Sequence, residues 1–303
     1  MSIASRLYAG AEDYPRMRAL LAEIESIEGP LVYCHVGDLD WWRATDTDPR
    51  PATERLRLWF DHHGTLLGFV WPSEHQVDLL VHPQQRALEP AMLDWAEHLE
   101  RDPSGAAGPH QLTVWSFAHD ALRNELLLGR GYTRTAIYLS LYVRDLAAAA
   151  PEPALPDGFT LRTLADADVH ARVAAHHDTF ALSELTVAGY RSARHDASYR
   201  ADLDLVVAAP DGSIAAFCTV WLDSVNRAGE LDPVGCRPAY RRQGLARAVV
   251  LEGLRRLQCL DARTATAFCG GLPEDQPARR MYAALGFVEQ AREYAWRKII
   301  DQG

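Results

Sequence analysis

Lysine is almost absent from this sequence. Lys298 is the only lysine among 31 basic residues, so a catalytic lysine is not expected in a chain whose single candidate stands near its end. An excess of basic residues is lacking as well, because 41 acidic residues give a formal charge of −10. A protein that holds nucleic acid through its phosphates needs a basic surface. The composition therefore predicts no nucleic-acid partner.

Cysteines are few, and long apolar runs are missing. The five cysteines are odd in number and form no C-x-x-C pair, and most stand within apolar runs; they are Cys34, Cys218, Cys236, Cys259 and Cys269. This pattern indicates free buried thiols in a reducing compartment. There is no stretch of 18 apolar residues and no apolar segment near the start. We expect a cytoplasmic protein with no membrane partner and no metal.

The length and the linker composition divide the chain in two. At about 150 residues per domain, 303 residues favour two domains. Residues 146–156 read Leu-Ala-Ala-Ala-Ala-Pro-Glu-Pro-Ala-Leu-Pro, which is typical of a semi-rigid linker. The predicted division is a domain over 1–148, a linker over 149–157 and a second domain over 158–303.

The same order of elements is predicted in both halves. In the second half, strands are expected at 159–163, 203–208, 214–222, 230–236, 263–269 and 287–298, with helices at 166–179, 183–192, 244–257 and 276–285. In the first half, strands are expected at 7–8, 56–62, 65–71, 76–81, 111–117 and 132–144, with helices at 14–27, 88–99 and 119–128. Hydrophobic periodicity and turn residues support these assignments. The fold class is α/β (α+β), with a mixed, mostly antiparallel sheet flanked by helices in each half.

The most informative stretch is Cys236-Arg-Pro-Ala-Tyr-Arg-Arg-Gln-Gly-Leu-Ala-Arg247, where a strand turns into an amphipathic helix. Gly244 has no Cβ, so a ligand can approach the backbone closely there. The amides of residues 241–246 and the positive end of the helix dipole point to one place. Together with the neighbouring arginines they predict a pyrophosphate-binding turn, for which a plain helix start with solvated arginines is the alternative.

The spacing Arg241-x-x-Gly244-x-Ala246 resembles motif A of the GNAT superfamily of acyl-CoA-dependent N-acetyltransferases. A second stretch, Pro277-Ala-Arg-Arg-Met-Tyr-Ala-Ala-Leu-Gly-Phe287, is similar to the family's motif B, although Asp275 stands where asparagine is usual. The resemblance implies two tandem GNAT domains, with a layout similar to that of mycothiol synthases. It implies acetyl-CoA as co-substrate, bound by residues of the fourth strand and the turn, namely Val234, Gly235, Cys236, Arg241, Arg242, Gln243, Gly244, Leu245, Ala246 and Asp275.

The resemblance also implies candidates for catalysis. Tyr282, at the motif B tyrosine, would protonate the leaving thiolate; a core aromatic residue is the alternative. Glu230 and Asp232 share one face of the fourth strand, and either is a candidate base. His176, His177 and His195 are weaker candidates for the acceptor pocket. For Trp41-Trp42 a packing role is favoured over stacking on a ligand, and for His62-His63 a hairpin turn is favoured over a metal site.

The first half lacks the glycine turn. Its corresponding stretch is Val81-His-Pro-Gln-Gln-Arg-Ala-Leu-Glu-Pro90, in which Glu89 would place negative charge where a pyrophosphate should lie. We expect a degenerate first domain and a catalytic second one. The predicted function is acetyl transfer to the amine of a small molecule by direct attack. A protein N-acetyltransferase and a non-catalytic acyl-CoA sensor remain alternatives, and neither the acceptor nor the oligomeric state can be predicted.

Overall fold

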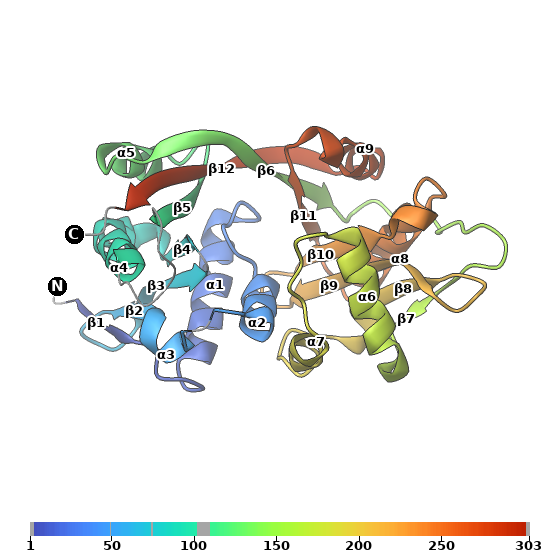
Figure 1. The fold of residues 1–303 in the computed structure, drawn as a ribbon, viewed down its shortest axis with the longest axis horizontal. Helices are drawn as coiled ribbons and strands as arrows, with labels where there is room; N and C mark the ends of the chain where they lie inside the picture. Colours follow the sequence, from blue (N-terminus) through green and yellow to red (C-terminus); the bar gives the residue numbers. More distant parts are fainter. Residues whose placement is uncertain (1–2, 49, 74, 102–109, 301–303) are drawn as a thin grey trace.

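The computed structural model describes residues 3–48, 50–73, 75–101 and 110–300. Within these ranges, twelve strands form one continuous sheet (Figure 1). The strands are β1 (Ala4–Leu7), β2 (Arg57–Phe60), β3 (Leu66–Ser73), β4 (Gln76–Val81), β5 (His110–Phe117), β6 (Thr133–Asp145), β7 (Thr160–Thr163), β8 (Asp204–Ala208), β9 (Ile214–Asp223), β10 (Ala228–Cys236), β11 (Thr264–Gly270) and β12 (Val288–Ile300). The helices are α1 (Tyr14–Glu28), α2 (Val36–Thr45), α3 (Ala52–Arg55), α4 (Glu89–Arg101), α5 (Ala121–Gly129), α6 (Val169–Thr179), α7 (Val187–Ala193), α8 (Leu245–Cys259) and α9 (Gln276–Ala284).

The strand order shows the repeat that the sequence predicted. It runs β1-β2-β3-β4-β5-β12-β6-β11-β10-β9-β8-β7. Adding six to the number of a strand in the first half gives the number of its counterpart in the second, and the two stand at equal distances from opposite ends of this order. Most predicted elements lie within a few residues of their observed bounds. The helix expected from residue 183 begins at Val187, and the strand expected at 7–8 is β1, which ends at Leu7.

The last strand of each half completes the sheet of the other half, which the sequence did not reveal. Residues 293–300 of β12 pair with β5 of the first half, and residues 139–145 of β6 pair with β11 of the second. The two strands also pair with each other, and Figure 1 shows them crossing the molecule side by side. Two separate sheets were expected, but these long strands join them into one.

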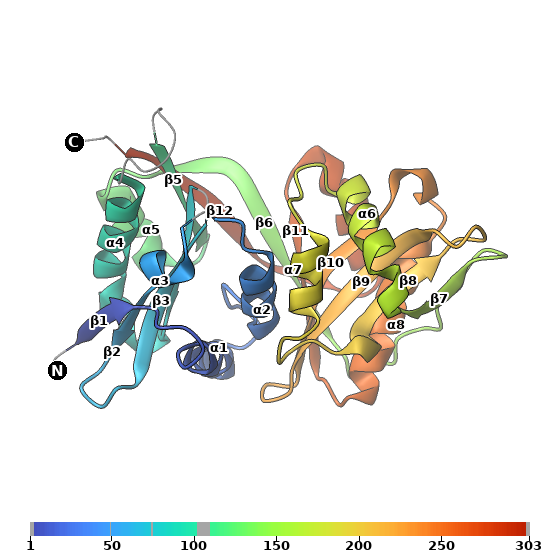
Figure 2. The same cartoon turned by 60° about the horizontal axis from the view of Figure 1, so that its bottom comes forward.

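Helices cover both faces of the sheet in each half. In the second half, α8 packs against one face through a stripe of apolar residues at helical spacing, as predicted, while α6 and α7 pack against the other. In the first half, α4 covers one face, and α1 and α2 cover the other. Figure 2 shows α2 between the sheet of the first half and α7 of the second. None of the described helices is long and apolar enough to cross a membrane.

Helix α2 was not predicted, and it connects the halves. It begins after His35, whose Nδ1 accepts a hydrogen bond from the Gly37 amide at 3.1 Å. A Cβ on Gly37 would lie 2.2 Å from Cγ of Trp221, so the helix backbone lies directly on β9. Farther along α2, the buried Asp40 accepts hydrogen bonds from Tyr14 and from the Ser198 amide of the second half. These contacts place α2 at the junction of the two halves.

The predicted linker lies against the second half. The chain from 146 to 159 has no helix or strand. The Ala150 amide donates to Oε1 of Gln258 at 3.0 Å, and Nε2 of Gln258 donates to the Leu146 carbonyl at 2.7 Å. Leu155 packs against the core beneath α8. The segment is therefore anchored by both polar and apolar contacts.

Candidate functional site

The turn between β10 and α8 has the backbone geometry of an anion-binding loop. Gly244 has a φ of +82° and Arg242 a φ of +66°, both in the left-handed region. A Cβ on Gly244 would meet nothing within 4 Å, so the turn is open at that point. The conformation favours glycine at 244, and the open space leaves room for a ligand against the backbone.

The amides of this turn are free. Within the described part of the chain, no hydrogen bond engages the backbone N–H groups of residues 242–247. These groups lie at the N-terminus of α8, where the helix dipole is positive, and Leu245 anchors the helix start in the core. A row of unpaired amides at a helix start is the arrangement that binds phosphate groups in proteins.

The arginines around the turn have different partners. Arg237 forms an ion pair with Asp178 of α6 at 2.6 Å, and Nε of Arg241 donates to the Cys236 carbonyl at 3.2 Å. Arg242 and Arg247 are exposed and have no hydrogen-bond or ion-pair partner among the described residues, and Gln243 is exposed beside them. Two arginines therefore shape the turn, and two are available to a ligand.

Strands β10 and β11 separate beside this turn. They pair in parallel only from Ala228 and Thr264 to Glu230 and Thr266. Beyond Glu230, β10 stays paired with β9 alone, through Val234, Gly235 and Cys236, after an irregularity that includes the cis Asp232–Pro233 bond. The edge of β10 that faces β11 is therefore unpaired over these residues, and its backbone groups can hydrogen-bond to a ligand that enters between the strands.

Tyr282 on α9 lies in the core of the second half. Its side chain is buried, with its ring stacked on Tyr142 and edge-on to Phe287. Burial raises the pKa of its hydroxyl well above the ordinary value, and Cys218, Cys269 and Asp232 raise it further. These groups belong to β9, β11 and β10, and the hydroxyl keeps its proton at neutral pH.

Asp275 has a structural hydrogen bond. Its Oδ2 accepts from the Leu272 amide at 3.0 Å, just before α9. A Cβ on Gly270 would lie 2.2 Å from the same oxygen, so glycine is required at the end of β11. The carboxylate holds the loop from β11 to α9 in place.

Glu230 is buried beneath α2. Only 1% of it is exposed, its Oε2 lies 3.5 Å from Nδ1 of His35, and this oxygen has no hydrogen-bond partner among the described residues. Burial raises the pKa of the Glu230 carboxyl well above its ordinary value, and Asp38 and Asp232 raise it further. A raised pKa makes the carboxylate a stronger base than an exposed glutamate, which is the property that a general base needs.

Asp232 lies two residues along the same strand and is half-buried. Its carbonyl accepts a hydrogen bond from Nε1 of Trp221 at 2.6 Å. Burial raises the pKa of its carboxyl to about 7, with a further increase from Asp38, while Arg172 of α6 lowers it. The two carboxyl candidates from the sequence are thus brought together on one face of the sheet.

Three further buried or half-buried acids, which the sequence did not reveal, come from α2, β4 and β12. Burial raises the pKa of Asp38 to about 6 and of Asp78 to about 7, and the pKa of Glu293 rises well above its ordinary value. Asp38 influences the pKa of both Asp78 and Glu293, so α2, β4 and β12 bring acids to one region. The repeat offers a signal for Asp78, because it pairs with Trp71 as Glu230 pairs with Trp221.

The histidines and tryptophans singled out in the sequence have different surroundings in the structure. His176 is buried and its Nδ1 bonds Oγ of Ser183 at 2.8 Å; burial lowers its pKa to about 3. Nε2 of His177 bonds the Leu185 carbonyl at 2.7 Å, and His195 is exposed. His62 and His63 lie in the turn between β2 and β3, as predicted. Trp41 packs against Tyr190 and Trp221 of the second half, and Trp42 against Trp71.

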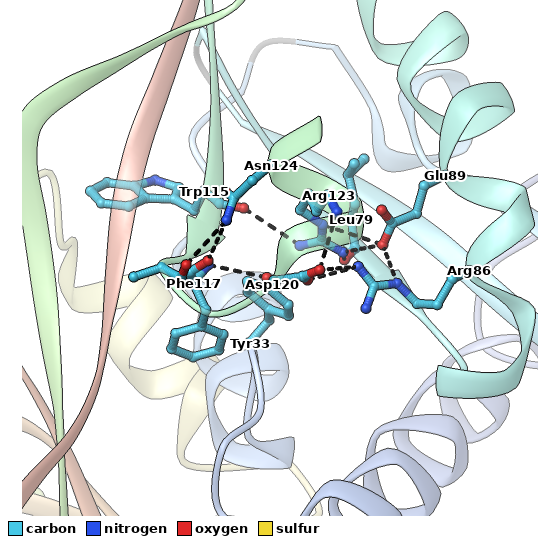
Figure 3. Close-up of polar contacts among 10 residues, drawn as sticks. Tyr33, Leu79, Arg86, Glu89, Trp115, Phe117, Asp120, Arg123 and Asn124 are labelled. Atoms are coloured by element: carbon cyan, nitrogen blue, oxygen red, sulfur yellow. Dashed lines mark hydrogen bonds and ion pairs between the residues drawn. The ribbon is translucent and has the colours of Figure 1, made fainter. Parts of the chain in front are cut away.

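In the first half, side chains occupy the corresponding turn (Figure 3). Glu89, at the start of α4, is buried and forms ion pairs with Arg86 at 2.8 Å and with Arg123 at 2.7 Å. Arg86 also pairs with Asp120 at 2.7 Å, and Nη2 of Arg123 donates to the Leu79 carbonyl of β4 at 2.8 Å. The Glu89 carboxylate and the Leu79 carbonyl of β4 therefore already have partners within the chain. A cavity of about 300 Å³ remains beside them, and Tyr33 and Phe117 are among the residues that line it.

The fold, the glycine turn and the separated strands define a class of enzyme. The model of the acetyltransferase (GNAT) family matches residues 172–287. The chain belongs to the GNAT family of acetyltransferases, enzymes that use acetyl-CoA.

The relatives of this chain include mycothiol acetyltransferases. That of Kineococcus radiotolerans is 30% identical over 226 residues, which cover 71% of this chain and 70% of the relative. That of Amycolatopsis mediterranei is 30% identical over 71% of this chain and 72% of its own length. Among solved structures, a tandem GNAT protein from the clavulanic acid biosynthesis pathway has a TM-score of 0.70 at 18% identity, with both chains fully covered. A GCN5-related N-acetyltransferase from Sphaerobacter thermophilus has a TM-score of 0.69 at 21% identity, covering 99% of this chain and 96% of that one.

Proposed function

We propose that the second half transfers the acetyl group, to the amine of a small molecule. The observation that carries this proposal is the difference between the two equivalent turns. After β10 the amides of residues 242–247 are free, whereas after β4 the start of α4 is occupied by Glu89 and its two arginines. The mycothiol acetyltransferases, whose name indicates a small acceptor, support the acceptor class.

Each part of the site has a step to perform. Acetyl-CoA supplies an acetyl group activated as a thioester. The free amides of residues 242–246, with the side chain of Arg242 and with Gln243 and Ala246, would bind its pyrophosphate, whereas the Arg241 amide, which the sequence included in this set, donates to the Pro238 carbonyl at 3.3 Å. Backbone groups of residues 234–236 would hold the pantetheine and stabilise the negative charge that develops on the acetyl carbonyl oxygen. Asp275 would act indirectly, by fixing the loop before α9.

Glu230 would remove the proton from the attacking ammonium, directly or through a water, and Asp232 is the second candidate for this role. The neutral amine attacks the carbonyl carbon, and the C–S bond breaks as the tetrahedral intermediate collapses. Tyr282 would give its proton to the departing thiolate and recover one, by way of solvent, from the nitrogen, which still carries an extra proton after the attack. A tyrosine hydroxyl is protonated at neutral pH, as this role requires.

Calorimetric titration of acetyl-CoA into the full chain tests the binding part of the proposal. We expect one site per chain, and we expect Gly244→Glu to abolish it by adding negative charge and a Cβ at a positive φ. Gly64→Glu is a matched control, because Gly64 also has a φ of +82° with nothing within 4 Å of a Cβ, and it lies in a hairpin turn of the first half. Two sites would contradict the assignment of a single active half, and no binding would remove the proposal.

Release of the CoA thiol on mixing with a panel of amines tests the transfer step. Tyr282→Phe is expected to lower kcat by about 10²-fold or more with unchanged acetyl-CoA affinity. Tyr142→Phe, which changes the ring stacked on Tyr282, is the control for packing. Equal kcat for wild type and Tyr282→Phe would exclude the tyrosine as the proton donor.

A further inference from the structure

Arg172 is a fully buried cation that has no hydrogen-bond or ion-pair partner among the described residues. It lies on α6 with 0% of its surface exposed, and Nε, Nη1 and Nη2 all lack a hydrogen-bond partner among the described residues. Its guanidinium carbon lies 3.6 Å above the centre of the Phe217 ring and 5.1 Å from that of Tyr190. Aromatic faces attract the charge but leave the N–H groups, which lie in the guanidinium plane, unsatisfied.

The other large buried arginines show how unusual this is. Arg55 and Arg123 are equally buried, but Arg55 pairs with Asp46 and donates to the Pro72 carbonyl, and Arg123 pairs with Glu89. A guanidinium cannot lose its proton at physiological pH, so a buried one needs an acceptor. The five donors of Arg172 therefore require a partner that is not part of the described chain.

The position of Arg172 connects it to the transfer site. Phe217, on which it stacks, lies against Gly235 of β10, where a Cβ would meet the ring at 2.2 Å. One aromatic ring thus separates the guanidinium from the strand segment proposed to hold the acetyl group. The charge of Arg172 also lowers the pKa of Asp232 and of His176, one turn farther along α6.

We propose that Arg172 binds a carboxylate of the acceptor, so that the acceptor is an amine that also carries a carboxyl group. This inference rests on the proposed function and narrows its substrate class. A planar carboxylate matches the fork of N–H donors on a guanidinium, and it carries the single negative charge that one arginine balances. Glu230 and Asp232 on the neighbouring strand would receive the ammonium group of the same molecule. A dianionic phosphate fits less well in a region that already holds these acids.

Matched pairs of amines that differ only in the carboxylate test the proposal on the full chain. L-lysine with cadaverine, L-ornithine with putrescine, and L-phenylalanine with phenethylamine provide such pairs, with CoA release as the readout. We expect wild type to favour the carboxylated member of the pair that it accepts by tenfold or more in kcat/KM. In Arg172→Gln the preference should fall to about one, with the affinity for acetyl-CoA unchanged. Arg191→Gln, an exposed arginine on α7, is the control.

The outcomes separate this inference from the proposed function. Equal use of both members of a pair, or turnover only of amines without a carboxylate such as amino sugars, would overturn the role of Arg172 and leave the acetyltransferase proposal intact. A carboxylate preference that survives in Arg172→Gln would also overturn it. If acetyl-CoA binds but no amine is acetylated, the proposed transfer itself fails.

Thermal unfolding of Arg172→Met gives a second test that needs no acceptor. Methionine keeps the length and the contact with Phe217 but removes the unpaired charge, so we expect Tm without ligand to stay equal or rise. Arg123→Met, which breaks a buried ion pair, is expected to lower Tm strongly. If Arg172→Met lowered Tm as much as Arg123→Met, the Arg172 guanidinium would already be paired inside the protein, and the proposal would be overturned.

Discussion

Carboxyl groups buried near one another dominate the chemistry of single residues in this enzyme. Asp38 raises the pKa of both Glu230 and Asp232 on top of the effect of burial, and Asp232 raises that of Glu230. Two of the three come from β10, and the third comes from α2 of the other half. Bringing them together makes the Glu230 carboxylate more basic than an exposed glutamate, as its proposed role as the base requires.

The pH dependence of turnover follows from the role of Glu230. A base acts when ionised, so kcat/KM should rise with pH through the raised pKa of this carboxyl. Glu230→Gln should lower kcat/KM by about 10²- to 10⁴-fold and remove this rise. Asp232→Asn is the comparison, because it changes the second candidate. If Asp232→Asn abolishes the rise with pH and Glu230→Gln keeps it, Asp232 is the base and Glu230 is not.

The same carboxyls make stability depend on pH. In the range from pH 6.5 to 8 these acids are ionised in the unfolded chain, whereas folded Asp78 and Asp232 have pKa values of about 7. The folded state therefore binds more protons, and its stability must fall as pH rises through this window. We expect Tm to be lower at pH 8 than at pH 6.5, and Asp78→Asn, which mimics the protonated form, to reduce the difference. An unchanged Tm difference in Asp78→Asn would show that Asp78 does not contribute.

At the scale of elements, the turn before α8 could be predicted from the sequence, whereas helix α2 could not. The Arg241 to Ala246 spacing and the apolar stripe of α8 are local patterns, so the strand, the turn and the helix could be placed from the sequence. Helix α2 starts with histidine as its N-cap, which is an uncommon choice, and Gly37 disfavours a helix in isolation. Packing on Trp221 stabilises it instead, and this long-range contact left no local pattern. The acids that α2 brings were missed for the same reason.

The contact between Gly37 and Trp221 gives a prediction for this element. A Cβ at 37 would lie 2.2 Å from the indole, so Gly37→Ala should push α2 away from β9. We expect a loss of about 1–3 kcal/mol in stability and a lower acceptor turnover, with acetyl-CoA binding retained. Gly129→Ala is the matched control, because a Cβ in α5 would meet nothing within 4 Å. If Gly37→Ala behaved like Gly129→Ala, α2 would not lie directly on β9.

At the scale of the whole molecule, the exchange of β6 and β12 determines what can fold alone. Residues 158–303 by themselves would leave the outer edge of β11 unpaired and β12 without either neighbour. An unpaired edge of this length favours aggregation. We expect this fragment to be insoluble or oligomeric in size-exclusion chromatography, and co-expression with residues 1–157 to restore a soluble complex. A monomeric fragment that binds acetyl-CoA would contradict this expectation.

The crossing strands also limit how such an enzyme can evolve. A duplicated gene is often diversified by recombination, in which one copy is replaced by a homologous segment from another gene. Here, replacing residues 1–148 would also replace β6 within the sheet that holds the proposed transfer site, because that strand pairs with β11. New acceptor preferences are therefore expected to arise by point changes in α2 and α6, which face the site, and both halves should descend together as one inherited unit.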